Sequence, residues 1–69
     1  MSQITFEQCK PGQLYKVDFT TSYELAYVVS KGDRFKTIQM YYLRLGVLEE
    51  WNINVLKNYA VLVSDVAEI

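Results

Sequence analysis

The residues that could carry out chemistry are few, and their spacing fits no catalytic site. The 69-residue chain has no histidine, and Cys9 is its single cysteine. Acid–base catalysis near neutral pH and activation of a thiol both depend on a group such as histidine. One cysteine also excludes an intramolecular disulfide and a zinc site of the Cys/His type. We interpret Cys9 as a small buried hydrophobic residue.

The carboxylates and glycines are no better placed for chemistry. Glu49 and Glu50 are adjacent, so in a strand they point to opposite faces and cannot act as a pair. Asp18 and Asp33 fall in different predicted loops, without the spacing of a metal site. The three glycines are isolated, so the chain has no glycine-rich phosphate loop. The sequence predicts a protein that is not an enzyme and uses no metal or cofactor.

Length and composition predict one domain, residues 1–69, with more apolar surface than it can bury. A chain of this size hides only about 60% of its unfolded surface on folding. Hydrophobic residues nevertheless make up 51% of the sequence. We therefore expect an exposed apolar patch that a second copy or another protein covers. The lone thiol and the absence of a signal peptide at residues 1–4 favour a cytoplasmic location.

The charges are nearly balanced but unevenly distributed. The net charge is −1, which argues against a protein that depends on many phosphate contacts. Basic residues gather in the middle of the chain, and acidic residues in its last third. This arrangement has two interpretations, a solvated hairpin tip or a basic patch that meets an acidic partner or nucleic acid. The basic residues in question are Lys31, Arg34, Lys36 and Arg44.

In several short runs every second residue is apolar, and residues typical of turns end each run. Pro11-Gly12 turns the chain into a strand over residues 14–19, with Tyr15, Val17 and Phe19 on one face. Further strands are predicted over residues 23–30, 35–45, 47–51 and 59–64, with turns at residues 31–34 and at Gly46. The run over 35–45 exceeds the usual strand length, so we expect it to bend or split.

Two short helical segments complete this pattern. Thr5 and Gln8 have the spacing of a capping box, which would place Phe6 and Cys9 on one face of a helical turn. The alternative is a strand with Ile4 and Phe6 facing inward. Residues 52–57 predict a single 3₁₀ turn before the last strand. The predicted fold class is therefore all-β, with five short strands.

Three segments resemble SH3-like proteins. Residues 10–17, Lys-Pro-Gly-Gln-Leu-Tyr-Lys-Val, look like the opening of many small SH3-like barrels. Residues 46–51, followed by Leu56, resemble the third and fourth strands of short SH3-like proteins of tailed bacteriophages. Residues 57–61, Lys-Asn-Tyr-Ala-Val, are similar to the closing segment of SH3 domains. The resemblance implies a five-stranded SH3-like barrel and an accessory protein that acts in the cytoplasm of a bacterial host.

The same resemblance implies that Trp51 and Tyr59 correspond to aromatic residues of the groove that binds proline-rich peptides. The acidic loop that pairs with an arginine of such peptides is absent. This absence argues against polyproline recognition.

The predicted function is a non-catalytic protein-binding module. Residues 40–43 are apolar on both faces of their strand, and a thin barrel buries only one face. Methionine, tyrosine and tryptophan are enriched in interface centres. The partner is expected to be a bacterial host protein, which the chain would modulate or inhibit, or a second copy; no membrane is involved. The residues predicted to bind it are Tyr23, Tyr41, Leu43, Leu45 and Trp51.

The alternative is a small barrel that binds nucleic acid or a nucleotide. A sponge for a signalling nucleotide, held between subunits, is one form of it. The residues for this alternative are the basic group Lys31, Arg34, Lys36 and Arg44, together with nearby aromatic rings.

Overall fold

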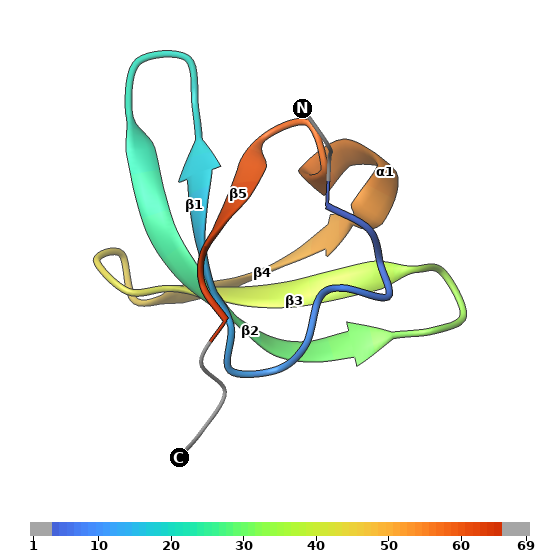
Figure 1. Cartoon of the computed structure of the whole chain (residues 1–69). Helices are drawn as coiled ribbons and strands as arrows, with labels where there is room; N and C mark the ends of the chain where they lie inside the picture. Colours follow the sequence, from blue (N-terminus) through green and yellow to red (C-terminus); the bar gives the residue numbers. More distant parts are fainter. Residues whose placement is uncertain (1–3, 66–69) are drawn as a thin grey trace.

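Five strands form one antiparallel sheet in the computed structural model, which describes residues 4–65 (Figure 1). The elements are β1 (Leu14–Asp18), β2 (Tyr23–Gly32), β3 (Thr37–Tyr42), β4 (Val47–Asn52), α1 (Ile53–Leu56) and β5 (Ala60–Ser64). The strand order is β4-β3-β2-β1-β5, so β4 and β5 are the two edges and the sheet is open. The predicted all-β class with five strands is confirmed.

The sheet is strongly curled because β2 bends. Figure 1 shows β1 and β5 running across β3 and β4, with β2 joining the two directions. The pairing of β2 with β3 shifts register between Val28 and Ser30. Such a bulge leaves one residue unpaired and bends its strand. The bend gives the sheet a concave inner face and a convex outer face.

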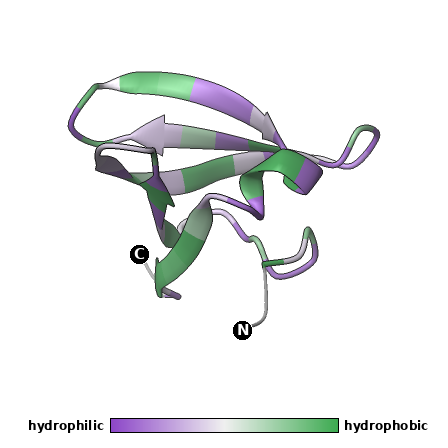
Figure 2. Ribbon diagram, turned by 90° about the horizontal axis from the view of Figure 1, so that it is seen from above, coloured by the Kyte–Doolittle hydropathy of each residue, from purple (hydrophilic) through white to green (hydrophobic). Residues whose placement is uncertain are grey.

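Alternation along the strands places the core on the inner face. Residues two apart in a strand point to the same side, and the β1–β3 strands bury every second residue. Two segments cover this face, namely α1 and the turn that precedes β1. The buried core consists of Phe6, Cys9, Tyr15, Val17, Ala26, Val28, Ile38, Met40, Tyr42, Ile53, Leu56 and Ala60. Figure 2 shows hydrophobic and hydrophilic segments alternating along the ribbon.

The strand predicted over residues 35–45 is shorter at both ends. Lys36 has a left-handed backbone conformation, φ 53°, which ends the turn before β3. At the other end Gly46, with φ 69°, donates its N–H to the carbonyl of Tyr42 and closes a tight turn. Phe19, predicted as the last residue of the first strand, lies one residue beyond β1, although its ring stays 6.5 Å from that of the buried Tyr42, on the predicted face. Its N–H donates to Ser22 in the loop after β1, and its side chain is 41% exposed.

Both short segments lie where the sequence placed them, but the first is a hydrogen-bonded turn over residues 5–9 and only the second, α1, is a helix. Thr5 and Gln8 exchange side-chain to backbone hydrogen bonds of 3.1 and 3.2 Å, and Phe6 and Cys9 are buried, as a capping box predicts. The turn before β5 is α-helical and not 3₁₀, since the Lys57 N–H donates to the carbonyl four residues earlier. Among residues 4–65, no helix has the length and apolar character needed to cross a bilayer.

Candidate functional site

The outer face of the sheet carries a continuous row of apolar side chains. Register pairs Leu14 with Tyr27, Tyr27 with Tyr41, and Tyr41 with Leu48, so the row crosses β1, β2, β3 and β4. Leu25 and Leu43 extend it toward the turn after β3, where the Leu43 N–H donates to the Leu25 carbonyl. We call these six residues the outer apolar face: Leu14, Leu25, Tyr27, Tyr41, Leu43 and Leu48.

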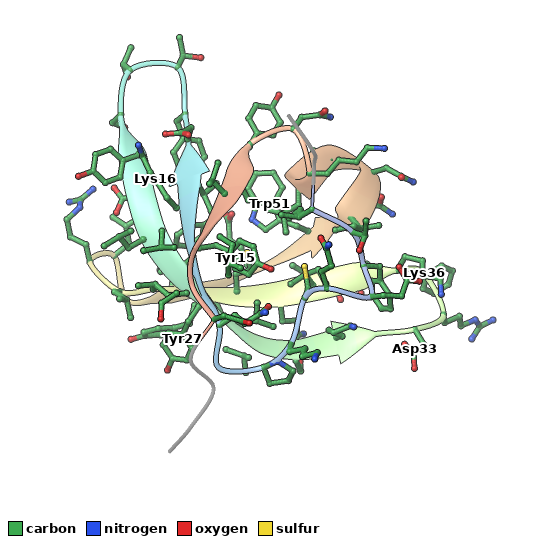
Figure 3. All side chains as sticks on the ribbon, in the orientation of Figure 1. Tyr15, Lys16, Tyr27, Asp33, Lys36 and Trp51 are labelled. Carbon is green, nitrogen blue, oxygen red and sulfur yellow. The ribbon has the colours of Figure 1, made fainter. Side chains whose placement is uncertain are left out.

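Aromatic packing orders the centre of the outer apolar face. The rings of Tyr27 and Tyr41 lie 5.7 Å apart at an interplanar angle of 57°. Figure 3 shows Tyr27 projecting from the sheet away from the interior. Tyr27 and Leu48 are exposed, and Tyr41 is half-buried by its neighbours. No described segment covers this side of the sheet, so its apolar atoms face solvent (Figure 1).

The structure separates the five predicted partner-binding residues. Tyr41 and Leu43 belong to the outer apolar face, and Tyr23 lies at its margin, opposite Asp18. Leu45 is exposed in the turn between β3 and β4. Trp51 pairs with the buried Ile38, which places it on the inner face. The predicted patch is therefore not one surface.

Trp51 belongs to a hydrogen-bonded cluster on the inner face. Its indole Nε1 donates to the Tyr42 hydroxyl over 2.8 Å, and that hydroxyl donates to Glu49 Oε1 over 3.2 Å. Burial raises the pKa of the Tyr42 phenol to about 12. The Trp51 ring also lies 6.1 Å from that of Tyr59, between β5 and α1 (Figure 3). Because the indole N–H is engaged, it is not available to a peptide carbonyl.

The hairpin between β2 and β3 gathers positive charge around one aromatic ring. The Nζ atoms of Lys31 and Lys36 lie 4.2 and 4.8 Å from the centre of the buried Phe6 ring. Each ammonium is stabilised by the negative face of the ring. Arg34 stacks on the exposed ring of Phe35 at the same hairpin. Three of the four predicted basic residues therefore share one end of the sheet.

Arg44 lies at the other end of the β2–β3 hairpin, in the turn after β3. Its guanidinium forms a two-pronged ion pair with Glu24, whose side chain is almost fully buried. The hydrogen bonds and charge of Glu24 raise the pKa of Arg44. An isolated buried carboxylate is costly, so Arg44 serves to neutralise Glu24. It is separated from the other predicted nucleotide-binding residues by the length of β3.

A groove of about 620 Å³ runs between the segment before β1 and strand β5. Its floor holds the buried Tyr15, whose hydroxyl contacts Gln13 Oε1 at 3.0 Å and Cys9 Sγ at 3.5 Å. Burial raises the pKa of the Tyr15 phenol well above its ordinary value. Gln13 in turn donates to Asp65. We call this space the β5 groove; its remaining lining residues include Ile4, Lys10, Ala60, Val61 and Leu62.

Sequence reasoning missed part of the outer apolar face. In β2, Leu25 and Tyr27 alternate with Ala26 and Val28, so they share one side, but this alternation does not show which side the core covers. Leu14 and Leu48 follow from register, which cross-strand pairing sets and local pattern does not. Within residues 4–65, no group of three or more histidine, cysteine, aspartate or glutamate side chains is placed to hold a metal ion.

Comparison of the chain with protein-family models, with curated proteins and with solved structures finds no match in any of the three.

Proposed function

We propose that the protein is a non-catalytic protein-binding module that docks its outer apolar face on another folded protein. The observation that carries this proposal is the uncovered row of apolar residues across four strands. Exposed apolar patches of this kind mark interaction sites. Tyrosine, which presents a large apolar ring and a polar tip, is enriched at such sites. The Tyr27–Tyr41 pair would form the centre of the interface.

The size of the face is sufficient for specific binding. The four strands that carry it lie about 4.8 Å apart, so their backbones span about 14 Å. Burial of about 400 Å² of apolar surface on it would contribute roughly 10 kcal/mol. At the low end of the association cost, about 4 kcal/mol, roughly 6 kcal/mol of this gain remains. That net gain corresponds to a dissociation constant of roughly 40 μM. The convex shape of this face favours the surface of a folded protein over a peptide.

The finer parts of the proposal depend on the sequence resemblance. The strand order with a helical turn before β5 is compatible with an SH3-like barrel, although β4 and β5 do not pair. A bacterial host protein as partner, its inhibition or modulation, and action in the host cytoplasm follow from the likeness to phage accessory proteins. Those parts stay predictions.

The test compares the wild-type protein with two outer-face variants. Tyr27→Ser and Tyr41→Ser remove aromatic area without touching the core, and Val55→Ser on α1 is the control for an exposed apolar residue elsewhere. A host protein captured by the wild type is purified and titrated calorimetrically against all four proteins. We expect the two tyrosine variants to bind at least about tenfold more weakly and Val55→Ser to bind normally.

Two results would contradict this function. Equal affinity of all four proteins would place the interface elsewhere. A wild-type protein that sizes as a dimer, and that becomes monomeric in the tyrosine variants, would assign the face to a second copy.

A second candidate function is anion binding at the β2–β3 hairpin. The observation that favours it is the pair of ammonium groups at Phe6, since no described carboxylate forms an ion pair with either of them. Nucleotide phosphates could bridge Lys31 and Lys36, while Arg34 and Phe35 offer a stacking surface. Calorimetric titration with mono- and dinucleotides tests this candidate. Binding that weakens with salt and disappears in Lys31→Gln and Lys36→Gln would support it.

A further inference from the structure

The free edge of β5 presents backbone groups that nothing in the described chain pairs. The Asp18 N–H donates to the Tyr59 carbonyl over 2.7 Å, which makes this a hydrogen-bonded pair. In antiparallel sheets such pairs alternate with pairs that are not hydrogen-bonded. The register of β1 with β5 therefore makes Lys16 and Val61 the next hydrogen-bonded pair. The N–H and C=O groups of Ala60 and Leu62 consequently point away from β1.

Leu62 is the accessible member of these two residues. Ala60 is buried, whereas the Leu62 side chain is 41% exposed. Because β5 is the last strand in the sheet order, no described strand lies on its outer side. Leu62 thus offers one unpaired donor and one unpaired acceptor along an extended backbone.

The two edges of the sheet differ in how they are protected. Native edge strands usually carry charges or proline that prevent pairing with another strand. The edge strand β4 has Glu49 and Glu50. The edge strand β5 has the sequence Ala-Val-Leu-Val-Ser, without a charge or a proline. An unprotected apolar edge of this kind can pair with a further strand.

The β5 groove runs along this edge. Val61 and Leu62 point to opposite faces of the sheet, yet both line the groove. The groove therefore follows the edge of β5, and the segment holding Ile4, Gln8 and Lys10 forms its opposite wall. Its volume of about 620 Å³ lies within the range of ligand-binding sites.

We propose that the β5 groove binds an extended peptide segment of a partner protein, which adds to the sheet as a sixth strand beside β5. The backbone of the peptide pairs with the N–H and C=O of Leu62. A peptide residue opposite Leu62 points to the inner side, where the apolar side chains of Ile4 and Leu62 favour an apolar residue. Backbone pairing supplies affinity and this side-chain position supplies specificity.

An extended peptide fits this site better than a second copy of the chain. Edge-to-edge pairing of two β5 strands would bring a whole folded domain against the edge. The segment before β1 lines the groove opposite that edge, which hinders the approach of a second folded domain more than that of one extended chain. The proposal goes beyond the docking of the outer apolar face and uses a different surface.

Amide hydrogen exchange of the protein alone is the first experiment. Val61 donates into the β1 ladder and is expected to exchange slowly, whereas the Leu62 amide is expected to exchange at least about tenfold faster. A Leu62 amide as protected as that of Val61 would show the edge already covered and would overturn the proposal.

The second experiment uses a random-peptide display library as the probe, panned on the wild-type protein. The strongest binder is expected to slow exchange of the Leu62 amide. N-methylation of its residue opposite Leu62 is expected to weaken binding about tenfold, whereas N-methylation of the next residue has little effect. Equal effects of the two methyl groups, or enriched peptides that leave Leu62 exchange unchanged, would overturn strand addition.

Variants separate this site from the proposed function. Leu62→Pro removes the free-edge N–H without removing a ladder bond, and Leu62→Ala keeps that N–H as the matched control. Peptide binding is expected to be lost in the proline variant and retained, though weakened, in the alanine variant. If the proline variant does not fold, the N-methylated peptides still test backbone pairing with Leu62 on the wild-type protein. Tyr41→Ser is expected to leave peptide affinity unchanged. The peptide assay therefore tests the β5 groove separately from the proposed docking of the outer apolar face.

Discussion

At the scale of single residues, the hydroxyl of Tyr42 connects the core to the edge strand β4. It accepts a hydrogen bond from the Trp51 indole and donates one to Glu49, so three polar groups of the inner face satisfy each other. Among residues 4–65, no buried side-chain nitrogen or oxygen lacks a partner. Removal of the Tyr42 hydroxyl would leave a polar group of this cluster without its partner, which lowers the stability of so small a core.

Replacement of Tyr42 by phenylalanine tests this role. The ring stays in place, but the partly buried Trp51 N–H loses its acceptor. We expect a loss of about 1–2 kcal/mol in the free energy of unfolding, measured by urea denaturation. Tyr41→Phe on the outer face is the control and should change stability by less than about 0.5 kcal/mol. Equal stability of Tyr42→Phe and the wild type would contradict the role assigned to the hydroxyl.

The raised pKa of Tyr42 makes stability depend on alkaline pH. An unfolded tyrosine loses its proton near pH 10, whereas the buried Tyr42 keeps its proton to about pH 12. Deprotonation therefore favours the unfolded chain within this window. The contribution is fully present below pH 10 and is lost as the pH rises toward 12.

The slope of this loss is measurable. We expect the free energy of unfolding to fall by up to about 1.4 kcal/mol per pH unit for Tyr42, with buried Tyr15 acting in the same direction. Urea denaturation followed by circular dichroism at pH 9, 10 and 11 gives the slope. Tyr42→Phe should show a shallower slope. A stability that stays constant over this range would refute the assignment.

At the scale of elements, the turns decide where strands begin and end. The sequence predicted the strand positions because apolar alternation and Pro-Gly or Gly signals are local features. It extended β3 too far because residues 35–45 keep alternating through both turns. Nothing in the pattern marks Lys36 as left-handed, since lysine rarely adopts that conformation; the fold imposes it.

Two positions with positive φ, Gly46 and Lys36, allow the backbone strain of these turns to be measured as a change in stability. Gly46→Ala places a side chain at φ 69°, where the nearest atom of another residue is 3.7 Å away, so the cost is backbone strain alone. We expect a loss of about 1 kcal/mol, which lowers Tm by roughly 4–8 °C. Lys36→Gly should recover part of such strain and raise Tm relative to Lys36→Ala. A Gly46→Ala variant that melts with the wild type would contradict this account.

At the scale of the whole molecule, the fold has one covered face and one uncovered face. The sequence predicted an excess of apolar surface correctly, because composition and length determine how much can be buried. It could not predict which residues would share a surface, since curvature and register assign them. Trp51 and Tyr41 were expected in one patch, but the sheet separates them onto opposite faces. The basic group was divided for the same reason.

The two edges of the open sheet lead to a prediction about self-assembly. Edge strands without charge or proline template the addition of further strands, especially when partial unfolding removes their cover. β5 is such a strand and β4 is not, because Glu49 and Glu50 protect it. We therefore expect aggregation on mild heating to begin at β5.

Lysine substitutions at matched positions on the two edges test this expectation. Val63 on β5 and Val47 on β4 are 53% and 45% exposed, so a lysine at either position reaches solvent without entering the core. Thioflavin fluorescence during incubation below Tm measures the lag time of β-aggregation. Val63→Lys should lengthen the lag several-fold, whereas Val47→Lys should change it little, because β4 already carries charge. If both variants delay aggregation equally, the effect arises from net charge, and β5 is not the edge at which assembly starts.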